Sequence, residues 1–195
     1  MHIKKKSNGD EIKIWREEKL REKQSENSAF ILCGQREITS QVRKMSHVLP
    51  TLTKKIEVDT IIRDTLDEVL VLRFGRATET LCLQLDHILS KAAREVSKFA
   101  TVALVDVDSE EIQVYIKYFD ITLIPSTVFF FNAHHMKMDY GTADHTKWVG
   151  SFYTKQDFID VVETIFRGAM KGKLIVKCPL PPERVPKYQI LYKDV

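Results

Sequence analysis

Residues 69–82 read VLVLRFGRATETLC, and this stretch decides the fold class of the chain. Its first part, 69–74, is a near-continuous apolar run, which is typical of a parallel strand covered on both faces. Gly75 opens a short polar loop, and from Leu81 onward apolar residues recur with a helical period. The stretch therefore predicts a buried strand, a loop and a long helix whose beginning carries Glu79 and Cys82.

The sequence after Met45 predicts alternating strands and helices. Leu49 and Pro50 lead into a polar turn. We then expect strands at 69–74 and 100–107, followed by antiparallel strands at 126–131 and 135–140. A first helix precedes these strands, a second lies between 74 and 100, a third contains Ile112 to Phe119, and a last helix runs from Thr154 to about Gly168. The apolar residues of the first helix are Ile56, Val58, Ile61, Ile62 and Leu66, and the stripe of the second is Leu81, Leu85, Ile88, Leu89, Ala92 and Val96.

Two helix starts carry capping signals. Asp108 is predicted to be an N-cap acid ahead of the helix that contains Ile112. Thr154 and Asp157 have the spacing of a capping box. Beyond Gly172, prolines exclude a regular helix, so we expect an extended tail that wraps the domain.

This order of elements resembles that of thioredoxins, and Ile124-Pro125-Ser126-Thr127 matches their cis-proline turn. The resemblance implies an α/β, thioredoxin-like three-layer fold, with a mixed central sheet of about four strands flanked by helices and an extended C-terminal tail. It also implies that Pro125 is cis and faces the loop before the long helix. In thioredoxin enzymes that turn binds the backbone of the substrate, and here it either keeps such a role or only directs the third strand.

The same resemblance defines a degenerate redox site made of Glu79, Cys82 and Pro125. In thioredoxins the first cysteine of CxxC lies at a helix N-terminus, which lowers its pKa and keeps it a thiolate. Glu79 occupies that attacking position here, and only the resolving position, Cys82, retains sulfur. Arg73 replaces an acidic proton carrier. A carboxylate near Cys82 disfavours its thiolate, so we expect Cys82 to be a buried packing residue.

Composition divides the chain into two segments. Residues 1–44 hold 11 Lys+Arg against 7 Asp+Glu, whereas residues 45–195 hold 19 against 20. We expect 1–44 to be a disordered or partly helical charged extension and 45–195 to be the thioredoxin-like domain with its tail. Since the folded part is near neutral, a protein partner is favoured and direct RNA binding is not expected.

Cysteine and histidine positions argue against metal and cofactor sites. The three cysteines, Cys33, Cys82 and Cys178, are widely separated, which indicates a reducing compartment. His134, His135 and His145 lack the spacing of zinc ligands. No apolar stretch predicts a membrane span or a secretory signal, so we expect the nucleus or cytosol and no membrane partner.

Two regions are candidate interaction surfaces. Arg167, Lys171 and Lys173 cluster with Lys177 near the end of the last helix, where they either complement the helix dipole or contact an acidic partner or phosphate. Trp148, with Phe152 and Tyr153, forms either an exposed aromatic anchor or part of the core.

Longer motifs identify a more specific family. The segments at 45–50, 71–76, 105–108, 124–132, 139–141, 144–147 and 166–173 resemble the Dim-type thioredoxin-like proteins of the spliceosome. Residues 1–44 have no counterpart in that family. The resemblance implies a nuclear, non-enzymatic subunit acting in pre-mRNA splicing and needed for cell-cycle progression. It also implies binding to a large tri-snRNP splicing factor, and self-association as a homodimer. The alternative is a residual one-cysteine thiol oxidoreductase that uses Cys82.

Overall fold

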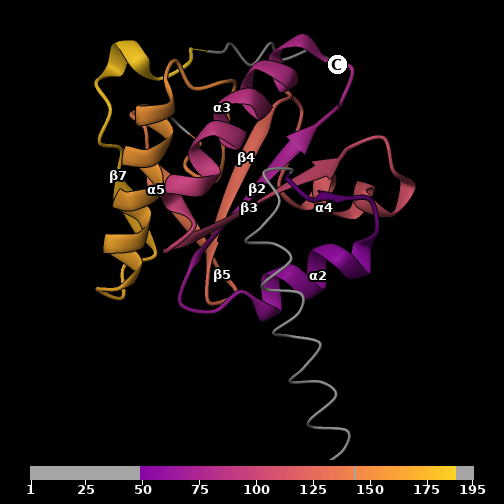
Figure 1. Cartoon of the computed structure of the whole chain (residues 1–195), viewed down its shortest axis with the longest axis horizontal. Helices are drawn as coiled ribbons and strands as arrows, with labels where there is room; N and C mark the ends of the chain where they lie inside the picture. Colours follow the sequence, from indigo (N-terminus) through magenta and orange to yellow (C-terminus); the bar gives the residue numbers. More distant parts are fainter. Residues whose placement is uncertain (1–48, 143, 188–195) are drawn as a thin grey trace, which may run out of the picture. The chain divides into compact units, whose positions relative to one another are not determined.

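The computed structural model describes residues 49–142 and 144–187. They form a seven-stranded sheet in the order β1-β3-β2-β4-β5-β7, with the short β6 paired to β4 (Figure 1). The strands are β1 (Thr51–Leu52), β2 (Val69–Gly75), β3 (Ala100–Asp106), β4 (Ser126–Phe131), β5 (His134–Asp139), β6 (Trp148–Val149) and β7 (Ile175–Lys177). The helices are α2 (Lys55–Asp64), α3 (Thr80–Val96), α4 (Gln113–Tyr118) and α5 (Lys155–Ala169), with 3-10 turns η1 (Glu110–Ile112) and η2 (Pro182–Arg184).

Two apolar clusters cover the opposite faces of the sheet, because side chains alternate along each strand. Val69 and Val71 belong to the cluster that contains α3 and α5. Leu70, Leu72 and Phe74 belong to the cluster that contains α2 and α4. Every residue of β2 is buried, which confirms the prediction of a strand covered on both faces.

The four central strands predicted from the sequence are all present, as β2, β3, β4 and β5. β2 pairs in parallel with β3 and antiparallel with β4, so the sheet is mixed. β4 and β5 form the predicted antiparallel hairpin. Asn132 and Ala133 make its tight turn with φ of 49° and 63°, the conformation that short hairpin turns require.

Three short strands extend the sheet beyond the sequence prediction. The polar turn expected after Pro50 is instead β1, which pairs in parallel with β3. β6 pairs with the beginning of β4, and β7 pairs in parallel with β5. Strands of two or three residues carry no measurable period, so only their pairing partners define them.

Some residues predicted to lie on buried helix faces are exposed. Ile56 and Leu66 are 63% and 62% exposed, whereas Val58 and Ile61 of the same predicted set are buried. Leu66 lies beyond the end of α2 at Asp64. Leu81 is 48% exposed because nothing among the described residues covers the first turn of α3 on its side. Periodicity predicts the direction of a side chain and not whether another element covers it.

The N-cap predicted at Asp108 is wrong. The chain forms η1 from Glu110, with Ser109 at its N-cap position, and continues as α4, so Asp108 caps neither helix. Asp108 instead accepts a hydrogen bond from Arg76 Nε at 2.7 Å. This ion pair connects the loop after β2 to the loop after β3.

The capping box of α5 is confirmed. The Asp157 backbone N–H donates to Thr154 Oγ1 at 3.1 Å, and the Thr154 backbone N–H donates to Asp157 Oδ2 at 3.1 Å. Asp157 is fully buried and also accepts a hydrogen bond from Arg184 Nη1 at 2.7 Å. The start of α5 is therefore held by its own cap and by the C-terminal tail.

After the turn that follows α5, the described tail contains the strand β7 and the three-residue 3-10 turn η2, and no regular α-helix. Residues 1–44 and the aromatic and aliphatic residues from Tyr188 to Tyr192 lie outside the described residues, so their predicted conformations stay predictions. Within 49–142 and 144–187, no helix has both the length and the apolar character needed to cross a membrane.

Replacing Thr154 with alanine tests the capping box. Thr154→Ala is expected to lower the free energy of unfolding by about 1 kcal/mol, because the Asp157 N–H loses its acceptor. Urea denaturation of the full chain measures this change. The exposed neighbour variant Gln156→Ala is the control and is expected to stay within about 0.5 kcal/mol of wild type. A Thr154→Ala protein as stable as the control would contradict the role of the cap.

Candidate functional site

Glu79 lies at the N-terminus of α3, where the sequence predicts the vacant nucleophile position. It is the residue before the first helical residue, with φ −83° and ψ 126°, and its carbonyl accepts the Leu83 N–H at 3.0 Å. Its side chain is exposed and makes no capping hydrogen bond. The residue at the electropositive end of the helix is therefore one that carries a carboxylate rather than a thiol.

Cys82 is fully buried one turn into α3. Burial raises the pKa of its thiol, although a backbone hydrogen bond from Arg76 opposes the rise. The sulfur lies so close to Gly75 that a Cβ at that position would be 2.5 Å from Sγ. The thiol is thus a packing group held against the end of β2, as the sequence predicts, and it lacks the exposure and the low pKa of a reactive cysteine.

A buried ion pair lies beside Cys82. Arg73 on β2 is 2% exposed, and its Nε donates to Asp86 Oδ1 at 2.6 Å while a second guanidinium nitrogen donates to Oδ2. Burial raises the pKa of Asp86, and the hydrogen bonds from Arg73 oppose that rise. Asp86 was not predicted from the sequence. An arginine inside an apolar strand requires an acidic partner, and that requirement is the signal that could have located it.

The Ile124–Pro125 peptide bond is cis, as predicted. Phe74 on β2 is level with Ser126 on β4, so Pro125 lies at the same end of the sheet as Gly75 and the loop to α3. The Pro125 carbonyl accepts the Gly150 N–H at 2.8 Å. Sheet register therefore brings Glu79, Cys82 and Pro125 to one end of the domain, although no contact joins all three.

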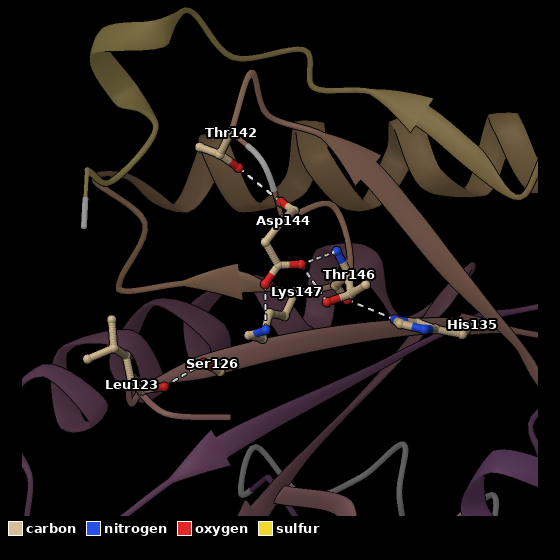
Figure 2. Close-up of polar contacts among 7 residues, drawn as sticks. All are labelled: Leu123, Ser126, His135, Thr142, Asp144, Thr146 and Lys147. Atoms are coloured by element: carbon tan, nitrogen blue, oxygen red, sulfur yellow. Dashed lines mark hydrogen bonds and ion pairs between the residues drawn. The ribbon is translucent and has the colours of Figure 1, made fainter. Parts of the chain in front are cut away.

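The loop between β5 and β6 is organised by Asp144 (Figure 2). Its carboxylate accepts hydrogen bonds from Thr146 N at 2.8 Å, from Thr146 Oγ1 at 2.6 Å and from the buried ammonium of Lys147. Burial disfavours the carboxylate, but these donors outweigh burial and lower the pKa of Asp144. In the same view, Ser126 Oγ donates to the Leu123 carbonyl at 2.6 Å beside the cis-proline turn.

Trp148 belongs to the core and is not part of a surface. It is 1% exposed, stacks on Phe152 with ring centroids 4.3 Å apart and meets Tyr140 edge to face at 5.4 Å. Only Tyr153, at 66% exposed, reaches the surface from this aromatic group. The prediction of Trp148 as an interaction residue is therefore wrong, because the tail covers this region.

The tail segment that covers Trp148 is held at two points. Arg184 Nη1 binds the buried carboxylate of Asp157. Val185 and Pro186 line the same small hollow as Trp148, and Pro186 Cβ would lie 3.2 Å from a Cβ at Gly150. Gly150 has a φ of 97°, so both its conformation and this contact favour glycine.

The predicted basic surface lies where α5 ends. Arg167, Lys171 and Lys173 are all exposed, and Arg167 donates to Glu163 one turn earlier on α5. Gly172, with φ 73°, reverses the chain there, and the Lys173 N–H returns to the Gly168 carbonyl at 3.0 Å. The chain then enters β7.

Comparison with known proteins identifies the family. The family model described as mitosis protein DIM1 matches residues 48–182. The chain belongs to the Dim1 family. Human thioredoxin-like protein 4B is 61% identical over 151 residues, which cover 77% of this chain and all of the human protein.

More distant relatives share the same region. Mitosis protein dim1 of Schizosaccharomyces pombe is 36% identical over 135 residues, or 69% of this chain and 94% of the relative. Spliceosomal protein DIB1 of Saccharomyces cerevisiae is 36% identical over 134 residues, or 69% of this chain and 92% of the relative.

The crystal structure of chloroplastic thioredoxin z has a TM-score of 0.50, at 18% identity, and the match covers 64% of this chain and 99% of the thioredoxin. This likeness confirms the predicted thioredoxin-like fold.

The buried thiol predicts slow alkylation. Cys82 in the native protein is expected to react with iodoacetamide far more slowly than in protein unfolded in guanidinium, because the thiol is buried and its pKa is raised. Peptide mass spectrometry at pH 8 measures the modified fraction at each cysteine. Modification of Cys82 at the same rate in both states would contradict the buried position.

Removing one partner of the Arg73–Asp86 pair is expected to cost much more stability than replacing both partners with apolar residues. Asp86→Ala is expected to lower the free energy of unfolding by about 3–5 kcal/mol, because Arg73 stays buried without a partner. The double variant Arg73→Leu, Asp86→Leu is expected to recover much of that loss. Urea denaturation compares the two proteins. Equal loss in both would show that the unpaired charge is not the cause.

The lowered pKa of His135 predicts that the domain becomes less stable in acid. Burial lowers the pKa of His135, whose Nε2 contacts the Thr146 carbonyl at 2.8 Å. Because the unfolded state binds a proton more readily below about pH 6.5, stability is full above that pH and falls as the pH is lowered toward the folded-state pKa. Wild type is therefore expected to lose more stability than His135→Gln between pH 7.5 and 5.5.

The exposed neighbour His134 provides the control for this prediction. His134→Gln is expected to keep the wild-type dependence of the urea midpoint on pH. An identical dependence in all three proteins would contradict the assignment to His135.

Proposed function

We propose that the chain is a protein-binding subunit of the splicing machinery, built on a thioredoxin-like scaffold that performs no thiol exchange. Two relatives carry names that point to this role, spliceosomal protein DIB1 and mitosis protein dim1. Family membership over residues 48–182 covers the whole folded core, including the loop at Glu79 and the basic end of α5.

The position of Glu79 is the observation that carries the non-enzymatic part of the proposal. A thioredoxin-type reaction begins with a thiolate at the start of this helix. Here Glu79 occupies that position and the remaining sulfur, Cys82, is fully buried. A carboxylate cannot form the mixed disulfide through which the reaction proceeds. The scaffold therefore acts by contact.

The contact surface proposed is the basic end of α5, with Arg167, Lys171 and Lys173. Its partner is a large protein of the tri-snRNP, and the chain acts in the nucleus, where its function supports cell-cycle progression. Self-association as a homodimer is part of the same proposal. The partner, the nuclear location, the cell-cycle role and the homodimer follow from the family resemblance, whereas the choice of surface rests on the exposed cations.

Affinity purification of the tagged full chain from nuclear extract tests this function. The expected result is recovery of tri-snRNP proteins. A charge-reversed surface, Arg167→Glu with Lys171→Glu and Lys173→Glu, is expected to reduce recovery at least about tenfold, as the loss of close charge pairs at an interface does.

The matched control reverses three other exposed cations, on α3 and the turn after it. It is the variant Lys91→Glu with Arg94→Glu and Lys98→Glu. The control is expected to recover tri-snRNP proteins like wild type. Recovery of redox proteins in their place would contradict the function. Equal recovery by both variants would contradict the surface.

A further inference from the structure

β7 is an outer strand of the sheet. It pairs in parallel with β5, and the strand order places no described strand on its other side (Figure 1). An outer strand presents unpaired backbone groups to which another extended chain can add. Binding at this edge depends on which backbone N–H and carbonyl groups of β7 are unpaired and on the side chains around them.

The register fixes which backbone groups point outward. Lys137 N–H on β5 donates to the Leu174 carbonyl at 2.8 Å, and Cys178 N–H donates to the Asp139 carbonyl at 2.9 Å. In a parallel pair, hydrogen bonds to one neighbour come from alternate residues. Val176 therefore faces β5 with its N–H and carbonyl, whereas the backbone groups of Ile175 and Lys177 point away from the sheet.

β7 is closely packed against α5. The Val176 side chain is buried beneath Gly168, where a Cβ would approach Val176 Cγ1 to 2.2 Å. The absence of a side chain at Gly168 lets the helix backbone lie directly over the strand. Because this packing already orders β7, binding of another chain would not have to remove conformational freedom from β7 itself.

Apolar and basic side chains surround this edge. Met170, Leu174 and Ile175 are 63%, 56% and 50% exposed. Lys171, Lys173 and Lys177 are also exposed, and none has an ion-pair partner among residues 49–142 and 144–187. The nearest acid by register, Asp139, is level with Lys177 but its Oδ1 accepts the Gly141 N–H at 2.9 Å.

The outward backbone groups, the lysines and the exposed apolar residues of this edge together favour one kind of binding partner over others. A second copy of the chain added antiparallel at the same edge would bring Lys173 and Lys177 of the two copies together, and like charges directly opposite are destabilising. RNA would be held by the lysines but would leave the apolar side chains and the outward amide pattern unused. An extended peptide with acidic and apolar side chains matches the backbone, the charge and the exposed apolar residues together.

We propose that the outer edge of β7 binds an extended acidic segment of a partner protein, which adds to the sheet beside Ile175 and Lys177. This inference rests on the proposed protein-binding function and names the chemistry of its partner. The added strand takes its affinity from backbone hydrogen bonds and its selectivity from the three lysines.

Fluorescence anisotropy with the full chain and a labelled peptide, Glu-Val-Glu-Ile-Glu-Val-Glu, tests the proposal. Saturable binding is expected, and it is expected to weaken as salt is raised because exposed charges are screened. The same peptide with lysine in place of glutamate, and an eight-residue oligouridylate, are the comparison probes. Binding of the lysine peptide or the oligouridylate as tightly as the acidic peptide would overturn the proposal, as would no saturable binding of the acidic peptide.

A matched pair of variants isolates the backbone contribution. Ile175→Pro removes the outward N–H at the first residue of β7, where proline is tolerated in a strand. Ile175→Ala keeps that N–H while removing the same apolar side chain. Ile175→Pro is expected to weaken binding about tenfold more than Ile175→Ala, with equal urea midpoints confirming that both fold. Equal affinity of the two folded variants would overturn strand addition.

The lysine contribution is tested separately, by Lys171→Gln with Lys173→Gln and Lys177→Gln. These changes are expected to remove most of the salt dependence of peptide binding, and an unchanged salt dependence would overturn the charge selectivity. Recovery of tri-snRNP proteins by wild type, together with failure of the acidic peptide to bind, would reject this edge while leaving the splicing function in place.

Discussion

A carboxylate at the beginning of α3 is the constraint on which the function of this chain depends. The helix terminus at that position can stabilise one anion. Glu79 provides it, while Cys82 is enclosed against Gly75 by the packing of α3 on β2. The scaffold retains the helix, the sheet and the cis-proline turn that position a disulfide exchange site, but the one thiol at this site, Cys82, is buried.

Two charge pairs, each with a buried member, connect elements of the domain. Arg73 and Asp86 occupy the space next to Cys82, and Asp157 joins the start of α5 to Arg184 of the tail. Such pairs contribute little net stability but make the alternative arrangements, in which a buried charge is unpaired, strongly unfavourable. The first pair fixes α3 to β2, and the second fixes the start of α5 to the described tail segment. The other end of α5 carries Arg167 and leads through Lys171 and Lys173 into β7.

The central fold could be predicted from sequence because its elements are long and periodic. The near-continuous apolar run of β2, the stripe of α3 and the Thr154–Asp157 box each identify their element without knowledge of the rest. β1, β6 and β7 could not be predicted, since a strand of two or three residues exists only through its neighbours. For the site, motif spacing located Glu79, Cys82 and Pro125. The ion-pair partners, and the covering of Trp148 by the tail, depend on contacts between segments distant in sequence.

The insulin disulfide reduction assay tests the central claim most directly, with dithiothreitol as the electron donor and wild type compared with Cys82→Ser. Because the only sulfur of the site is buried and no thiol lies at the helix N-terminus, both proteins should show the same background rate. Sustained turnover by wild type that Cys82→Ser abolishes would contradict the account, since it would require Cys82 to become exposed and act as the nucleophile.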